Sequence, residues 1–179
     1  MKKVIVILFL LISGFGFAQE STPFYEQIAF DKYRFEIIDS FPVKKRIKVY
    51  KYAFDFQPTL FWFYTPSCLS NIVWKSNDQF QPIKKYTDSQ LNIDSNRFEL
   101  DFSDLDKQQF KIKKFGRGNY PKLFISPPYK ENGNDERIFI NIYEKHSERK
   151  EVIYHLEFDK SGKIKNWCQS LSESIIITH

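Results

Sequence analysis

Apolar positions along the chain repeat with two different periods, and each period predicts a different kind of element. Residues 24–41 carry two adjacent apolar stripes at helical spacing, and Pro23 suits the first turn of a helix. Pro42 keeps the residue before it out of the helical region, so we expect the helix to end there. The first stripe comprises Phe24, Ile28, Phe35 and Ile38, and the second comprises Phe30, Tyr33, Ile37 and Phe41.

After the helix the apolar period shortens to two, which is typical of strands with one buried face. The alternation is clearest in the last third, where Ile138, Ile140 and Ile142 share one face of residues 137–145. Residues 159–162 then supply turn chemistry ending in glycine, so we expect an antiparallel meander of hairpins. The predicted strands are residues 46–56, 60–64, 72–74, 97–102, 122–126, 137–145, 151–159, 163–169 and 175–178.

Residues 104–113 fit two structures. As a helix they are capped by Ser103, and as a strand they place Phe110 and Ile112 inside; their Leu, Lys and Gln favour the helix. Helix followed by strands predicts an α+β fold, with the N-terminal helix packed on a curved antiparallel sheet and a C-terminal β-meander. This element order resembles cystatin-like and NTF2-like architectures in shape. An all-β sandwich is the alternative if residues 104–113 are a strand.

The first 18 residues have the pattern of a secretory signal peptide. Two lysines precede the apolar run 4–12, and Gly16 and Ala18 provide the small-x-small end before Gln19. We therefore expect residues 1–18 to be cleaved and residues 19–179 to form a single exported domain, periplasmic or secreted. The alternative is a membrane anchor, but the apolar run falls short of the ~20 residues that a spanning helix needs. We expect no membrane span after cleavage.

Composition and charge narrow the class of partner. Charged residues make up 27% of the 179 residues and apolar residues 42%, which is ordinary for a folded protein. The net charge of +5 includes Lys2 and Lys3, so the expected mature chain is less basic. The remaining basic clusters, at 44–46 and 111–114, are short and typical of solvated surfaces. We therefore expect no nucleic-acid partner.

Two cysteines, Cys68 and Cys168, remain in the expected mature chain. An even pair in an oxidising compartment predicts a disulfide. The bond would close a loop of about 100 residues, worth roughly 4–5 kcal/mol on the chain-entropy model. Two buried free thiols are the alternative.

Catalytic and metal-binding patterns are weak. His155 and Glu157 share a face of a predicted strand, with Asp159 at the following turn, and a histidine beside a carboxylate can act as a general base. Alternation alone, however, predicts a solvated outer face there. His146, Glu148 and Glu151 fit an ordinary polar turn. No metal-binding or phosphate-binding motif is present, so we expect no metal and no cofactor.

Aromatic residues are the unusual feature, at 18% of the chain with 19 Phe. Phe fills cores, whereas Trp and Tyr suit a half-exposed binding surface. We expect an exported module that binds a protein or small-molecule ligand rather than an enzyme. The alternatives are a small hydrolase or isomerase that uses His155 with a carboxylate, and an envelope or surface assembly component. The candidate ligand-binding residues are Trp62, Tyr64, Trp74, Tyr129 and Trp167.

Overall fold

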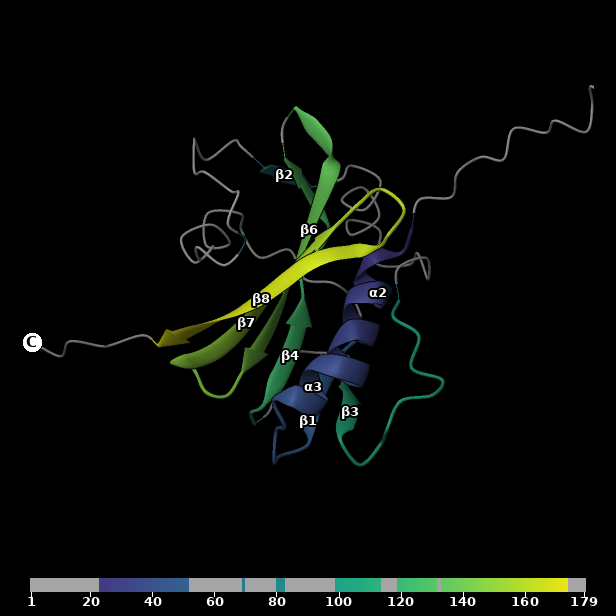
Figure 1. Cartoon of the computed structure of the whole chain (residues 1–179). Coiled ribbons are helices and arrows are strands. Elements are labelled where there is room, and N and C mark those ends of the chain that lie inside the picture. Colours follow the sequence, from purple (N-terminus) through teal and green to yellow (C-terminus); the bar gives the residue numbers. More distant parts are fainter. Residues whose placement is uncertain are drawn as a thin grey trace, which may run out of the picture.

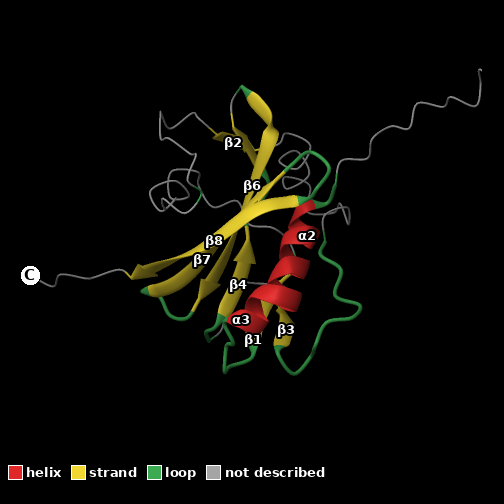
Figure 2. Ribbon diagram, in the orientation of Figure 1, coloured by secondary structure: helices red, strands yellow, loops and turns green. Residues whose placement is uncertain are grey.

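The computed structural model describes residues 23–51, 69, 80–82, 99–113, 119–131 and 133–173. Within these ranges a helical segment lies against one face of an eight-stranded mixed sheet, as Figures 1 and 2 show. The predicted α+β class is confirmed, and the all-β alternative is wrong because residues 25–40 are helical. None of the helices in these ranges is long and apolar enough to cross a membrane.

The helical segment joins three elements: α2 (Tyr25–Lys32), the π-helical turn η1 (Tyr33–Ile37) and α3 (Ile38–Ser40). It ends at Phe41, which leaves the helical region (φ −131°, ψ 71°) before Pro42, as predicted. Tyr25, Ala29, Tyr33 and Ile37 are buried four residues apart. An α-helix has 3.6 residues per turn, so side chains spaced four residues apart gradually rotate away from the sheet along the helix. The π-helical turn has more residues per turn, and it therefore keeps Tyr33 and Ile37 on the side that faces the sheet.

Burial corrects the predicted apolar stripes. The second stripe enters the core through Phe30, Tyr33 and Ile37. The first stripe is divided, because Ile38 is buried in the same core whereas Phe35 is exposed. Phe41, the last member of the second stripe, is 42% exposed because the helix has already ended there. Both stripes contribute to the core, and sequence spacing alone does not determine which of their members are buried.

The sheet centres on its longest strand, β6. Strand β6 pairs antiparallel with β7 on one side and with β4 and β5 on separate stretches of the other, and β7 pairs with β8. Strand β1 lies between β3 and β4 and pairs with both in parallel, while β2 pairs with β5. The strands are β1 (Ile47–Tyr50), β2 (Phe80–Pro82), β3 (Phe110–Lys113), β4 (Lys122–Ile125), β5 (Tyr129–Glu131), β6 (Asn134–Lys145), β7 (Lys150–Phe158) and β8 (Ile164–Glu173).

The prediction of a purely antiparallel sheet is therefore wrong at β1. Long stretches of chain separate β1 from β3 and β4, and a connection of that length permits pairing in either direction. An alternating pattern reports which side chains are buried, but not the direction of the neighbouring strand. The C-terminal meander β6–β7–β8 is antiparallel as predicted.

The predicted helix at residues 104–113 is also wrong. Residues 110–113 form β3, and the backbone N–H of Ile47 donates to the carbonyl of Gln109 over 2.8 Å. Phe110 is buried in the core under the helix. Pairing with β1 and burial of this ring outweigh the modest helix propensity of the segment. The predicted strands at 60–64, 72–74 and 175–178 lie outside the described residues.

The C-terminal sheet is buried on both faces, not on one. Ile138, Ile140 and Ile142 of β6 enter the core under the helix, as predicted. Phe139 of the opposite face joins Leu69 and Tyr129 in a second apolar cluster, against which Cys168 packs. The side chains predicted to form a solvated outer face are therefore in part interior.

Candidate functional site

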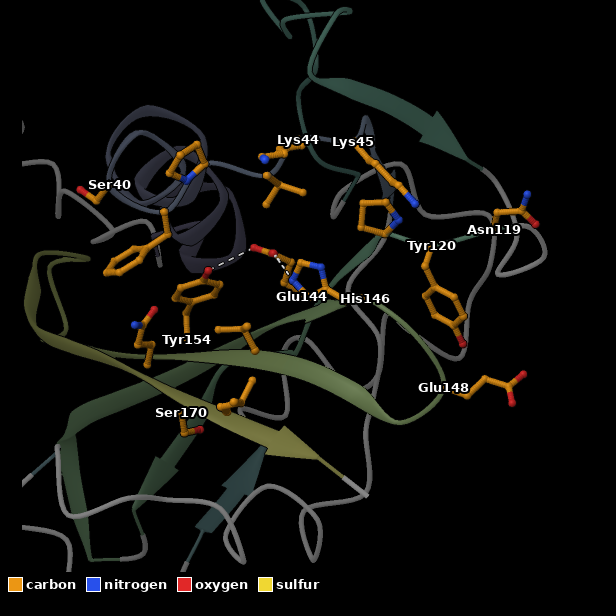
Figure 3. A pocket seen from close by; sticks show the side chains of 17 residues that line it. Ser40, Lys44, Lys45, Asn119, Tyr120, Glu144, His146, Glu148, Tyr154 and Ser170 are labelled. Carbon is orange, nitrogen blue, oxygen red and sulfur yellow. Dashed lines mark hydrogen bonds and ion pairs between the residues drawn. The ribbon is translucent and has the colours of Figure 1, made fainter. Parts of the chain in front are cut away.

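A cavity of about 1320 Å³ lies where the helical segment ends above the β6–β7–β8 meander. Figure 3 shows the carboxylate, imidazole and phenol of its floor on one side, with two lysines across from them. The chain brings the cavity together from the end of the helix, the segment before β4, the β6–β7 turn and the last part of β8. Its lining comprises Ser40, Phe41, Pro42, Val43, Lys44, Lys45, Asn119, Tyr120, Pro121, Glu144, His146, Glu148, Val152, Tyr154, Gln169, Ser170 and Leu171.

Glu144 forms the centre of the cavity floor, and its side chain is held by three partners. The hydroxyls of Tyr33 and Tyr154 donate to its Oε2 atom over 2.5 Å and 3.1 Å. His146 Nε2 lies 2.6 Å from the other oxygen, Oε1. A carboxylate that is only 2% exposed needs such donors, because an unpaired buried charge is costly. The three partners come from the helix, from β7 and from the turn that follows β6.

Both tyrosines remain protonated donors. Burial raises the pKa of Tyr33 well above its usual value, and the nearby charge of Glu144 raises it further. The same two causes, burial first, raise the pKa of Tyr154. The floor is thus a fixed network of two phenols and one carboxylate.

His146 is the third partner of Glu144, and its second ring nitrogen is the feature of interest. It follows β6 at the hairpin turn, where its backbone N–H donates to the carbonyl of Lys150 over 2.9 Å. Because Nε2 faces a carboxylate that only accepts, Nε2 carries a proton. No hydrogen bond from its Nδ1 atom to another group occurs within the described residues. In the neutral ring Nδ1 can accept a hydrogen bond, and in the charged ring it can donate one.

The remaining lining combines positive charge with exposed apolar surface. Lys44 and Lys45 make no ion pair in the part of the chain that the structure describes. Phe41 and Leu171, 42% and 59% exposed, are two of the four large apolar side chains exposed among those residues. Exposed apolar surface that gathers at a concave site is typical of a ligand-binding region.

His155, the predicted catalytic candidate, does not line this cavity, and no carboxylate contacts it in the part of the chain that the structure describes. It is 1% exposed on the opposite face of the sheet, so its predicted solvated position is wrong. Its Nδ1 atom lies 2.9 Å from Asn141 Oδ1, and its Nε2 atom lies 3.0 Å from Ser170 Oγ. The second apolar core on that face explains its burial.

The order Ser170–His155–Asn141 matches a nucleophile, a base and an orienting group, but the environment does not suit catalysis. Burial lowers the pKa of His155 to about 4, which makes the imidazole a weak base near neutral pH. Asn141 also donates to the hydroxyl of Tyr143 over 3.2 Å, so the chain of hydrogen bonds continues through the interior. We interpret this network as structural.

The two carboxylates predicted to assist His155 have other roles. Glu157 accepts a hydrogen bond of 2.6 Å from Arg137. Asp159 accepts hydrogen bonds from the hydroxyl and backbone N–H of Ser161, at 2.6 Å and 3.0 Å, and so closes the β7–β8 turn. The Ser161 hydroxyl is the main cause that lowers the pKa of Asp159 to about 2. The three predicted catalytic residues do not converge on one site.

The other predicted site residues are divided between the interior and the undescribed ranges. Tyr129 is buried in the second core, and Trp167 packs partly buried against the first, with Lys32 Nζ 5.9 Å from its ring centroid. Cys168 is not a free thiol, but its predicted partner lies outside the described residues, so the pairing stays a prediction. Among the residues described, no cluster of three metal-ligating side chains occurs. Cys68, Trp62, Tyr64 and Trp74 all lie outside those ranges.

Sequence reasoning missed the cavity floor, although one signal was present. Ile138, Ile140 and Ile142 mark the inward face of β6, and Glu144 continues that face with a carboxylate. A charged residue at an inward position needs buried partners, and this requirement points to a polar site. The partner from the helix, Tyr33, has no such signal because its position reads as apolar core.

Comparisons with known proteins provide no further guide to the site. No protein-family model, no curated protein and no solved structure significantly matches this chain. The chemistry of the cavity must therefore be argued from its own side chains.

Proposed function

We propose that this protein is a non-enzymatic binding module that takes a small anionic amphiphile into the cavity above Glu144. The observation that carries the proposal is the rim, where Lys44 and Lys45, without ion pairs among the described residues, accompany the exposed Phe41 and Leu171. An anionic head group would neutralise the lysines, and an apolar body would cover the two side chains. A volume of about 1320 Å³ leaves room for such a molecule.

The floor favours a particular orientation of this ligand. The Glu144 carboxylate, held by two phenols and His146, repels a second negative charge. The anionic head therefore stays beside Lys44 and Lys45. A hydroxyl or amide further along the ligand would bind His146 Nδ1, which supplies specificity at little cost.

A fluorescent anionic amphiphile, 1-anilinonaphthalene-8-sulfonate, tests the proposal directly. We expect saturable binding, and we expect Lys44→Gln/Lys45→Gln to weaken it at least tenfold. The matched control is Lys160→Gln/Lys163→Gln, which removes the same charge from the distant β7–β8 turn and should change affinity less than twofold. Equal loss in both double variants, or no saturable binding by the parent protein, would contradict the proposal.

Acid–base catalysis is a second candidate, supported by the 2.6 Å contact between His146 and Glu144. A carboxylate that accepts from one ring nitrogen orients the imidazole so that the other nitrogen faces the substrate, as a general base requires. The test is hydrolysis of an activated ester across pH, with His146→Gln as the variant. A rate that exceeds the buffer rate and disappears in His146→Gln would favour a small hydrolase over a binding module.

The proposal also includes export of the protein and, because the destination is oxidising, a disulfide between Cys68 and Cys168. Mass spectrometry of the exported protein should find a chain that begins at Gln19, and a retained Met1 would defeat the signal-peptide prediction. Thiol labelling under denaturing, non-reducing conditions should find no free thiol if Cys68 and Cys168 are bonded.

The cystatin-like or NTF2-like shape and assembly through a sheet edge remain proposals of lower priority, because the cavity supplies a more specific feature.

A further inference from the structure

Strand β8 is the last strand of the C-terminal meander, and within the described residues it pairs with β7 alone (Figure 1). Its other side is therefore an open edge in the part of the chain that the structure describes. Backbone N–H and C=O groups along such an edge can pair with a further strand. The edge borders the cavity described above, because Leu171 of β8 lines that cavity.

Hydrogen bonds elsewhere in the sheet determine which residues of β8 direct their backbone groups to this edge. The carbonyl of Asn141 in β6 accepts from the backbone N–H of Ser126, so the backbone of Asn141 faces away from β7. In an antiparallel ladder, two opposed residues either exchange both hydrogen bonds or face away from each other. His155 of β7 is opposed to Asn141, so its backbone faces β8, where it meets Cys168. The residues on either side of Cys168 therefore direct their backbone groups to the open edge.

This alternation assigns Trp167, Gln169 and Leu171 to the open edge. A direct contact agrees with the assignment, because the backbone N–H of Trp167 donates to the side-chain Oδ1 of Asn166 over 2.9 Å. The side chains of the three edge residues lie on the helix side of the sheet, since their register partners in β7 belong to the core under the helix or pack against it. Leu171 is 59% exposed there, so this edge combines available backbone groups with uncovered apolar surface.

We propose that the β8 edge pairs antiparallel with the same edge of a second copy of this chain, with Gln169 on the two-fold axis. Outward-facing residues then oppose outward-facing residues, as the hydrogen bonds of a ladder require. Trp167 of each copy comes to lie opposite Leu171 of the other. Because a two-fold interface uses the same patch on both copies, this aromatic–aliphatic pair forms twice.

The sequence of β8 suits pairing with itself in this direction. Lys165 lies two residues before Trp167, and Glu173 lies two residues after Leu171. An antiparallel pair centred on Gln169 brings unlike charges together at both ends, whereas a parallel pair in register would bring like charges together. At the centre, the two Gln169 amides can donate to and accept from each other. This complementarity favours a second copy over an unrelated peptide.

The second copy would extend the cavity wall. Neighbouring strands lie about 4.8 Å apart, so the partner strand continues the sheet directly beside Leu171. The partner's Trp167 then borders Leu171 along the sheet, while the cavity side of Leu171 stays available to a ligand. The inference does not rest on the proposed amphiphile, because it depends only on the backbone and side chains of β8.

Sedimentation equilibrium of the protein from micromolar to millimolar concentration measures the association. We expect a reversible monomer–dimer equilibrium, because one short ladder buries less surface than a permanent dimer needs. Leu171→Lys should weaken dimerisation at least tenfold, since a charge replaces the apolar partner of Trp167. The matched control is Phe35→Lys, which changes a side chain of similar exposure on the helix, 57% against 59%, and should alter dimerisation less than twofold.

A variant with the opposite effect protects the test against misfolding. The side chain of Asn166 occupies the Trp167 N–H that the partner strand needs. Asn166→Ala frees this N–H and should strengthen the dimer at least twofold, a change that misfolding would not produce.

Cross-linking tests the register. Gln169→Cys places two thiols opposite each other across the two-fold axis, and a short bis-maleimide should join them. Leu171→Cys is the matched control, because the two copies of residue 171 lie four residues apart along the paired strands, about 13 Å, beyond the reach of the same reagent. We expect a covalent dimer of the first variant and not of the second.

Three results would overturn the proposal: a monomer at every concentration, equal weakening by Leu171→Lys and Phe35→Lys, or equal cross-linking of the two cysteine variants. Failure here is distinct from failure of the proposed function. Lys44→Gln/Lys45→Gln should lose affinity for 1-anilinonaphthalene-8-sulfonate and still dimerise as the parent does, because neither lysine belongs to β8.

Discussion

The hydroxyl of Tyr33 donates a 2.5 Å hydrogen bond to Oε2 of Glu144, a residue 111 positions further along the chain. This contact joins the π-helical turn to the central strand at the floor of the cavity. It links the way the helix packs on the sheet to the chemistry of the proposed site. The wider turn at Tyr33 places the phenol over the sheet, and Glu144 supplies the charge that the phenol stabilises.

Tyr33→Phe should lower the free energy of unfolding by about 1.5–3 kcal/mol, the usual range for a hydrogen bond to a charged group. Tyr154→Phe should cost less, because its hydrogen bond to the same oxygen is longer, at 3.1 Å. Urea denaturation of both variants checks the order. A Glu144→Gln background should shrink the effect of Tyr33→Phe, and an unchanged effect in that background would show that the contact does not stabilise the fold.

Glu26 should make the protein less stable as pH rises. It is 2% exposed, its Oε2 atom has no hydrogen-bond partner among the described residues, and burial raises its pKa to about 8 from 4.5. Between those values the folded state keeps a proton that the unfolded state releases, so stability falls by up to about 5 kcal/mol. Glu26→Gln should abolish this decline. Stability curves of parent and variant that stay parallel from pH 4 to pH 8 would contradict the assignment.

His155 should have the opposite dependence on pH. Burial lowers its pKa to about 4 from 6.5, so the unfolded state takes up a proton before the folded state does. The stability that the neutral ring contributes is complete above pH 6.5 and is lost as pH falls towards 4, by roughly 3 kcal/mol. Two-dimensional NMR of the imidazole should show a neutral ring at pH 5.5. A charged ring at that pH would contradict the buried network.

The two effects overlap between about pH 4.5 and pH 6.5 and act in opposite directions there. The pH profile of the parent protein alone is therefore uninformative in this interval. The profile of Glu26→Gln isolates the contribution of His155, which should then appear as a rise in stability with pH up to 6.5.

Gly162 should tolerate no side chain, for two separable reasons. Its φ is +85°, and a Cβ there would lie 2.8 Å from Cβ of Pro23 and 2.9 Å from Cδ1 of Ile28. Gly133, with φ +80° and nothing within 4 Å of its would-be Cβ, is the matched control. Gly133→Ala should cost about 1–2 kcal/mol from backbone conformation alone. Gly162→Ala should cost measurably more in thermal unfolding, and an equal cost would mean that the turn does not pack tightly on the helix.

The sequence pattern predicted those features that depend only on residues close together along the chain. The helix ends before Pro42, and Ile138, Ile140 and Ile142 face the core, because proline geometry and the period of a strand act over a few residues. The sequence could not reveal that β1 pairs in parallel, or that His155 is covered by a second core. Both depend on segments that are distant along the chain.

The same limit explains the sites. Phe41 and Leu171 are apolar in the sequence, and only the packing of the helix end beside β8 leaves them exposed at one cavity. Glu144 carried a visible signal, a carboxylate on an inward face, but its partners Tyr33 and Tyr154 read as core. Tertiary packing, rather than any motif, assembles the cavity.

The most direct test of the cavity proposal is an amide NMR titration with 1-anilinonaphthalene-8-sulfonate. We predict saturable shifts concentrated at residues 40–45, at the β6–β7 turn around His146 and at Leu171, with little change along Lys48 and Lys111. Shifts centred on β1 and β3, or scattered and unsaturable shifts, would contradict a ligand site above Glu144.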